Sequence, residues 1–203
     1  MSVRFFCLIC ISVLCSLFAG CGPEPGGEEV IERKRVGGDT VVTDVRQLDY
    51  LDLNLPSRYY LVFRQELSLL NVNGFFGMES EALTVAAAKA GIEATGPFSV
   101  LTYEWDTERG WADVAVALPV RADTRLPPYV TIELPATKAL ALDLEGDYEQ
   151  LSVMHVTLDR ELARRGLRPR LPAVEEYAVG PLQTNDPDEF RTRLIYPYES
   201  PAQ

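Results

Sequence analysis

The sequence predicts an α+β fold built from two related half-domains, each a helix laid on antiparallel strands. The segment Tyr129–Pro197 has the pattern strand, strand, helix, strand, strand, and a weaker copy of its last three elements lies upstream. In both copies the helix ends on basic residues and a glycine, within Lys89–Ile92 and within Arg164–Leu167. Both copies also finish on a strand with a proline near its end, Pro119 and Pro197. Two halves of this kind usually form a cleft between them.

The first half contains one strand, one helix and a strand pair. Apolar and polar residues alternate over Arg58–Leu67, which predicts a strand. A helix is predicted over Gly74–Ala90, because Asn73 suits the N-cap position and apolar residues then recur at helical spacing. Alternation resumes over Phe98–Trp105 and Ala112–Val120, and the short polar loop between these segments predicts a hairpin.

The second half repeats this order behind an additional strand. Alternation predicts strands over Tyr129–Leu134 and Lys138–Leu144. A long helix is predicted over Asp147–Leu167, since apolar residues form one stripe and charged residues occupy the other side. Two further strands are predicted over Ala173–Val179 and Asp188–Tyr196.

Residues 1–20 have the pattern of a secretory signal peptide. Arg4 is their only charge, and the apolar run Phe5–Phe18 is shorter than the roughly 20 residues that cross a membrane. The run ends in Leu17-Phe18-Ala19-Gly20-Cys21, which resembles the lipobox of bacterial lipoproteins. That resemblance implies cleavage before Cys21 and a lipid on its sulfur. The alternative is an ordinary signal followed by a free cysteine.

The rest of the chain divides into a tether and one domain. Residues 21–43 are expected to form a flexible tether, because Gly22–Glu29 is polar and rich in Gly and Pro. Residues 44–201 are expected to form the folded domain, with halves of about 44–124 and 125–201. All four cysteines lie at or before Cys21, so this domain has no thiol for a disulfide, a metal site or a nucleophile.

The charge balance argues against a nucleic-acid partner. The chain has 19 Lys and Arg against 30 Asp and Glu, a formal net charge of −11, and loss of the signal would make it more negative. Affinity for nucleic acids depends largely on basic residues that contact phosphates. The same acidity argues against a domain that lies flat on an anionic membrane. From the lipobox resemblance we expect the membrane connection to be the lipid on Cys21, in the cell envelope, with the domain facing the periplasm from the outer membrane.

The usual catalytic and cofactor patterns are missing from the sequence. His155 is the only histidine, so it would have to serve as the base of any serine triad, and a structural zinc site lacks ligands. His155 follows Leu151 by four positions and precedes Leu158 by three, which predicts a packing residue beside the apolar stripe of the helix. No cofactor and no metal are expected, and the residues favour a binding protein over an enzyme.

A strand-borne acid and several aromatic residues are the remaining candidates for a site. Glu175 alternates in phase with Tyr177, and its face holds small and apolar residues that are unusual for a solvated surface. If that face lines the cleft, Glu175 attracts a cation and Tyr177, Tyr103 and Trp105 supply aromatic walls. If it faces solvent, Glu175 is an ordinary surface acid. Glu176, in the opposite phase, is the competing candidate.

Several short motifs lie along the chain in a distinctive order and spacing. They are Ala90-Gly91-Ile92, Gly96-Pro97, Trp105-Asp106, Leu118-Pro119-Val120, Gly146–Leu151, Arg165–Pro169, Pro172 with Glu175-x-Tyr177, and Asp186–Pro197. Together they resemble the GyrI-like small-molecule-binding domain, which also forms the effector-binding part of multidrug-sensing transcription regulators. The resemblance implies two pseudo-symmetric strand–helix–strand–strand units, one antiparallel sheet, and two helices bordering a central ligand groove. It also implies that Glu175 and Tyr177 match the family's pocket acid and aromatic residue.

An amphipathic small molecule is accordingly the expected ligand. For Phe76, packing in the core is the alternative to ligand contact. The chain carries Arg193 where many members of the family have a second carboxylate, which puts a preference for cations in question. The predicted ligand-binding residues are Glu175, Tyr177, Tyr103, Trp105, Tyr148 and Phe76.

Three other functions stay open on the sequence alone. A structural or partner-binding lipoprotein would need no ligand in the groove. A hydrolase of strained electrophiles could use Glu175 to position or deprotonate water. A haem-binding protein is suggested by the related SOUL fold, in which His155 would be the one available nitrogen ligand.

Overall fold

The computed structural model describes residues 29–36, 40–47 and 49–199, and it divides the chain into two units, residues 1–47 and 48–203. In the first unit, β1 (Glu29–Val36) pairs with β2 (Thr40–Gln47) as an antiparallel hairpin. The predicted signal peptide and Cys21 lie outside the described residues. The hairpin occupies part of the segment for which a tether is predicted. Its strands are rich in Val, Ile and Thr, which favour extended backbone, and this explains the difference.

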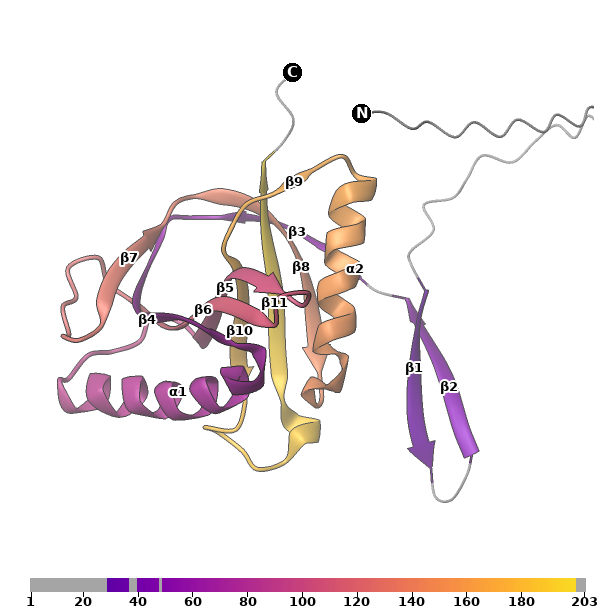
Figure 1. Cartoon of the computed structure of the whole chain (residues 1–203), viewed down its shortest axis with the longest axis horizontal. Coiled ribbons are helices and arrows are strands. Elements are labelled where there is room, and N and C mark those ends of the chain that lie inside the picture. The colour runs from indigo at the N-terminus through magenta and orange to yellow at the C-terminus, as the bar shows by residue number, and fades with distance from the viewer. Residues whose placement is uncertain (1–28, 37–39, 48, 200–203) are drawn as a thin grey trace, which may run out of the picture. The chain divides into compact units, whose positions relative to one another are not determined.

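The second unit contains every predicted strand and both predicted helices (Figure 1). Its strands are β3 (Leu51–Leu55), β4 (Arg58–Ser68), β5 (Phe98–Asp106), β6 (Trp111–Val120), β7 (Val130–Leu134), β8 (Thr137–Glu145), β9 (Arg168–Pro169), β10 (Ala173–Val179) and β11 (Arg191–Glu199). The helices are α1 (Val72–Lys89) and α2 (Leu151–Arg164), and short 3₁₀ turns occupy Leu69–Asn71, Tyr148–Gln150 and Pro187–Glu189.

The second helix is shorter than predicted at both ends. Asp147 caps the 3₁₀ turn Tyr148–Gln150, because its carboxylate accepts a hydrogen bond from the backbone N–H of Glu149 at 2.9 Å. At the other end Gly166 has a φ of 67°, a left-handed conformation that glycine adopts at little cost and that ends the helix. The strands β3 and β9 are not predicted by the sequence, since five and two residues are too short for a clear alternation signal.

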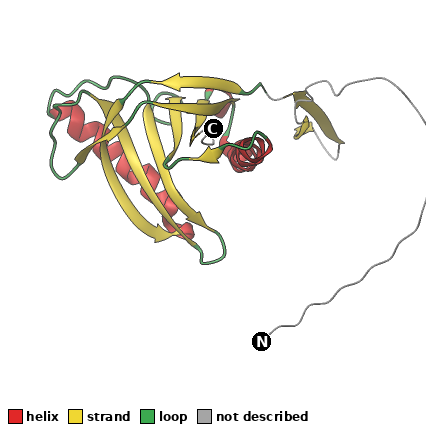
Figure 2. Ribbon diagram, turned by 90° about the horizontal axis from the view of Figure 1, so that it is seen from above, coloured by secondary structure: helices red, strands yellow, loops and turns green. Residues whose placement is uncertain are grey.

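The main sheet is antiparallel and follows the order β3-β8-β11-β10-β5-β6-β4-β7, with β9 paired to β11. The two halves are β4–α1–β5–β6 and β8–α2–β10–β11, so the predicted pair of strand–helix–strand–strand units is confirmed. In a flat sheet the two edge strands would lie about 34 Å apart. Side chains of both edges nevertheless pack into one apolar cluster, so the sheet is strongly curled into a half-barrel (Figure 2).

The inner face of the curl is filled by small and apolar side chains. Ala115, Ala117, Ala139 and Ala141 are fully buried there, and their small volume lets the strands curve closely around the cluster. The cluster comprises Tyr60, Val62, Leu101, Ala115, Ala117, Ala139, Ala141, Val174 and Ile195, with Leu51, Leu53, Leu55, Tyr103, Ile132 and Leu134 packed against it.

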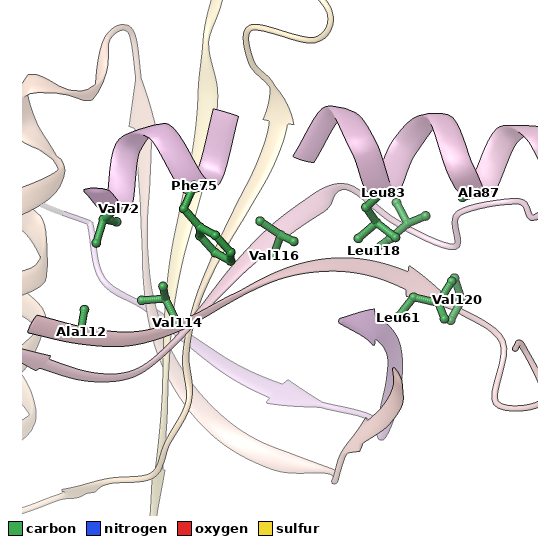
Figure 3. Close-up of a cluster of buried hydrophobic side chains, with 10 residues drawn as sticks. All are labelled: Leu61, Val72, Phe75, Leu83, Ala87, Ala112, Val114, Val116, Leu118 and Val120. Atoms are coloured by element: carbon green, nitrogen blue, oxygen red, sulfur yellow. The ribbon is translucent and has the colours of Figure 1, made fainter. Parts of the chain in front are cut away.

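Both helices lie on the opposite face of the sheet, each over its own half. Helix α1 packs on β6 and β4, where Phe75, Leu83 and Ala87 meet the apolar side chains of β6 (Figure 3). Helix α2 packs on β8 and β11 through Met154, Leu158 and Leu162. The central strands β5 and β10 pair with each other between these two packed regions, and neither makes the extensive helix contacts that β6 and β8 make.

Leu83→Ala is expected to lower the free energy of unfolding by about 2–5 kcal/mol, because this fully buried side chain would leave a cavity under α1. The same change at Leu70, which is 93% exposed, should alter it by about 0.5 kcal/mol or less. Urea unfolding followed by circular dichroism measures both. Equal costs for the two variants would contradict the packing of α1 on the sheet.

Candidate ligand-binding groove

A cavity of about 890 Å³ lies over the central strands, between the two helices. Its floor is formed by Phe98, Val100 and Thr102 of β5 and by Glu175 and Tyr177 of β10. These strands are adjacent and antiparallel, and the backbone pairs Glu175 with Val100 and Tyr177 with Phe98. Their side chains therefore point to the same side of the sheet, toward the helices.

The walls of the cavity come from the helices and from the loop after β10. Helix α1 contributes its first turns and α2 contributes one face, on which the lining residues recur at helical spacing. The wall residues are Val72, Asn73, Phe76 and Gly77 of α1, Leu151, Ser152, His155, Val156 and Asp159 of α2, residues 180–183, and Trp105, Thr107, Tyr148 and Tyr196.

The lining combines aromatic rings with negative charge. Six aromatic side chains and two carboxylates, Glu175 and Asp159, line the cavity, together with the imidazole of His155. Among the described residues that line it there is no Lys or Arg. A bound cation would therefore meet negative charge and aromatic faces and no Lys or Arg side chain.

Glu175 is held on the floor by two hydrogen bonds. Glu175 is buried, with 9% of its surface exposed. His155 Nε2 lies 2.9 Å from Oε1, and the Tyr177 hydroxyl donates a hydrogen bond to Oε2. Burial, and next the negative charge of Glu175, raise the pKa of Tyr177 well above its ordinary value. Tyr177 thus keeps its proton and acts only as a donor to this carboxylate.

His155 connects Glu175 to a second hydroxyl, that of Tyr196. Its Nδ1 lies 2.7 Å from the Tyr196 hydroxyl oxygen, and the two rings are 5.7 Å apart. Burial, followed by the charges of Asp159 and Glu175, raises the pKa of Tyr196. The sequence predicts a packing role for His155, whereas the structure places it in the groove with both ring nitrogens hydrogen-bonded. A haem iron would have to displace one of these two bonds.

Sequence reasoning missed His155 because its partners lie 20 and 41 positions away, on two different strands. One signal could have found it. Tyr148, Leu151, Ser152, His155 and Asp159 follow helical spacing, and all of them line the cavity.

Tyr148 lines the groove and packs against two other aromatic rings. Its ring stacks on Phe190 at 5.0 Å and meets the edge of Tyr177 at 5.5 Å. A Cβ at position 180 would lie 3.0 Å from the Tyr148 hydroxyl, so Gly180 leaves the space that this hydroxyl occupies.

The Tyr148 hydroxyl is buried and lacks a hydrogen-bond partner within the described part of the chain, as does the Thr192 hydroxyl. Burial, and then the charge of Glu175, raise the pKa of Tyr148 to about 12. The nearby Thr192 hydroxyl has a smaller opposing effect, although the two groups do not meet hydrogen-bond geometry.

The structure brings together five of the six predicted ligand-binding residues. Glu175, Tyr177, Tyr148 and Phe76 line the cavity, and Trp105 lies at its rim with 51% of its surface exposed. The open question of which way Glu175 faces is answered by its place on the cavity floor.

Tyr103 does not line the groove, which corrects the sequence prediction. The pairing of β5 with β6 shifts register between Thr102 and Glu104, and this bulge reverses the alternation that would put Tyr103 and Trp105 on one face. The Tyr103 ring instead packs against the inner face of the curled sheet, where the Arg64 guanidinium lies 3.6 Å from its centre.

Arg193, the basic residue that put cation binding in question, also lies on the inner side of the sheet. Arg193 is paired across the strands with Glu176, whereas Glu175 is paired with Leu194 on the groove side. Arg193 donates two hydrogen bonds to Asp143, with Nε–Oδ1 and Nη2–Oδ2 distances of 2.6 and 2.8 Å. Glu176 forms an ion pair with Arg58. Neither residue contributes charge to the lining of the groove.

The described residues contain neither a cluster suited to a metal ion nor a helix suited to a membrane. They contain no cluster of three or more His, Cys, Asp or Glu side chains arranged to hold a metal ion. None of the helices among them has the length and apolar character required to cross a bilayer.

Known structures share this fold. No protein-family model and no curated protein sequence matches the chain. The EcmrR C-terminal domain superposes with a TM-score of 0.63 and 16% identity, over 76% of this chain and 99% of that domain. SAV2435 bound to tetraphenylphosphonium superposes with a TM-score of 0.59 and 12% identity, over 75% of this chain and 95% of SAV2435. The chain spans 57% of the longer EcmrR chain solved in a DNA complex, with a TM-score of 0.62 and 16% identity. These likenesses support the predicted GyrI-like fold.

Tyr148→Phe and Tyr177→Phe are expected to differ in stability although their rings touch. Loss of the unpartnered Tyr148 hydroxyl should leave the free energy of unfolding unchanged or slightly higher, because no hydrogen bond within the described chain is broken. Loss of the Tyr177 bond to a carboxylate should lower it by about 1.5–3 kcal/mol. Urea unfolding at neutral pH measures both, and a larger cost for Tyr148→Phe would contradict these roles.

Proposed function

We propose that this protein binds an amphipathic small molecule, specifically a lipophilic organic cation, in the groove between α1 and α2. The observation that carries the proposal is the position of Glu175. Its carboxylate is held on the floor of an aromatic cavity, and the described lining residues include no Lys or Arg to balance it.

The size and chemistry of the cavity support this ligand class. A volume of about 890 Å³ is within the range that accommodates drug-sized molecules. Aromatic faces attract cations, and a buried carboxylate without a cationic partner is costly, so a bound cation would be stabilised by both. Each oxygen of Glu175 already accepts one hydrogen bond, so the carboxylate is positioned by the protein and a ligand with a delocalised charge can approach it without donating a hydrogen bond.

The structural neighbours support the same proposal. SAV2435, which has this fold, was solved with tetraphenylphosphonium, a bulky aromatic cation. A structural or partner-binding role does not require a mostly buried Glu175 that accepts hydrogen bonds from His155 and Tyr177 in a cavity. Ligand binding therefore accounts for more of the features of the groove.

Glu175→Gln is expected to weaken tetraphenylphosphonium binding by about tenfold or more, because it removes the negative charge and keeps the side-chain shape. Isothermal titration calorimetry at neutral pH measures the dissociation constant. Glu176→Gln is the matched control, since this neighbouring acid lies on the inner face with Arg58 and should leave the affinity unchanged. Equal effects of the two substitutions, or no binding by the wild type, would contradict the proposal.

We also propose that the domain is anchored to the bacterial cell envelope, at the periplasmic side of the outer membrane, through a lipid on Cys21. The support is the sequence Leu17-Phe18-Ala19-Gly20-Cys21 at the end of an apolar run. Several acyl chains on one cysteine anchor a protein firmly, because each buried methylene contributes about 0.8 kcal/mol.

Cys21→Ser is expected to abolish lipid attachment, because the serine hydroxyl cannot form the thioether. Metabolic labelling with a palmitate analogue and detergent phase partition of the full-length protein expressed in bacteria measure the change. Cys15→Ser, within the predicted signal, is the control and should label normally. Equal labelling of the Cys21→Ser variant would overturn the anchor.

A further inference from the structure

We propose that His155 sets the charge of the groove, so that its preference for cations over anions falls when this imidazole is protonated. The inference rests on the proposed function, since it concerns the charge that a bound ligand meets. It assigns to His155 the role of a specificity-determining residue.

The hydrogen bonds determine which nitrogen carries the proton when the imidazole is neutral. The carboxylate of Glu175 can only accept, so Nε2, 2.9 Å from Oε1, carries the hydrogen. Nδ1 then accepts a hydrogen bond from the Tyr196 hydroxyl at 2.7 Å. The Tyr177 hydroxyl completes the arrangement on the other oxygen of Glu175. In this state the carboxylate is fully available to attract a cation.

A second proton can enter this arrangement without a change of geometry. Protonated Nδ1 donates to the Tyr196 oxygen, and the Tyr196 hydroxyl hydrogen rotates to another direction, because a phenol both donates and accepts. The imidazolium then lies against Glu175 at the same 2.9 Å separation and cancels its charge. The groove keeps its shape, and its attraction for a cation weakens, because Asp159 is then the one carboxylate in the described lining without this compensation.

The other charged and titratable groups around His155 are consistent with this role. Glu175 faces it from β10 and Tyr196 from β11, and Asp159 lies one helical turn further along α2. Tyr196, Tyr177 and Tyr148 all have raised pKa values, chiefly because of burial, and keep their protons at neutral pH. Histidine is the side-chain type that ordinarily changes charge between about pH 5 and 8, and this chain has one.

Thermodynamic linkage gives the sign of the effect. A proton on His155 and a cation in the groove repel each other, so cation affinity rises as the proton is lost with increasing pH. The same linkage makes binding of a cation release protons. An anion of the same shape shows the opposite trend. One unit charge at contact distance in a partly buried site changes affinity by about tenfold.

Tetraphenylphosphonium and tetraphenylborate test this, because they match in shape, differ in the sign of their charge and do not titrate. Calorimetry at about pH 5.5 and about pH 8.5 should show about a tenfold gain in tetraphenylphosphonium affinity at the higher pH. The ratio of cation to anion affinity should rise with it. Near neutral pH, buffers with different ionisation heats should reveal proton release on cation binding by the wild type.

His155→Gln should remove the pH dependence of tetraphenylphosphonium binding, whatever its effect on the affinity at a single pH. Asp159→Asn should retain the pH dependence, which separates His155 from the carboxylate on the same helix. A wild type that binds the cation equally at both pH values, without proton release, would overturn the inference and leave the proposed function standing. So would a His155→Gln variant that retains the full pH dependence. No binding of either probe at any pH would overturn both proposals.

Discussion

Two helices of 18 and 14 residues lie on one face of a sheet that is eight strands wide, and this geometric constraint creates the groove. Each helix buries its apolar stripe on the strands of its own half. The central pair β5 and β10 lies between them and presents its side chains to an open space. The duplicated architecture therefore produces a cavity at the junction of the halves, where residues from both halves can meet one ligand.

The opposite face of the sheet supports the floor of the groove from below. Its curl is filled by alanines and larger apolar residues, and ion pairs such as Arg58–Glu176 and Arg64–Asp113 connect neighbouring and separated strands. These contacts hold together the strands that carry Glu175 and Tyr177. Arg58, Arg64 and Arg193 lie on that inner side, and the described lining of the groove contains no Lys or Arg.

The polar groups in the groove are organised around a single carboxylate. Glu175 accepts hydrogen bonds from Tyr177 and His155, and His155 in turn contacts Tyr196. The charge selection that we propose thus depends on a chain of groups drawn from α2, β10 and β11. Burial raises the pKa of Tyr177 and Tyr196, so both remain protonated partners in this chain of hydrogen bonds.

Periodicity alone determined most of the fold. Alternation and helical spacing located α1, α2 and the longer strands, and the repeated order indicated two similar halves, because local backbone preferences repeat in the sequence. Glu175 and Tyr177 were also identifiable, since an acid and an aromatic residue two positions apart share one face of a strand. The tertiary structure decided which way individual side chains face and which distant residues they contact. A bulge in β5 moved Tyr103 away from Trp105, strand register placed Arg193 opposite Glu176, and the pairing of distant segments gave His155 its two partners. These outcomes depend on contacts between residues far apart in the chain, and no local pattern of residues encodes them.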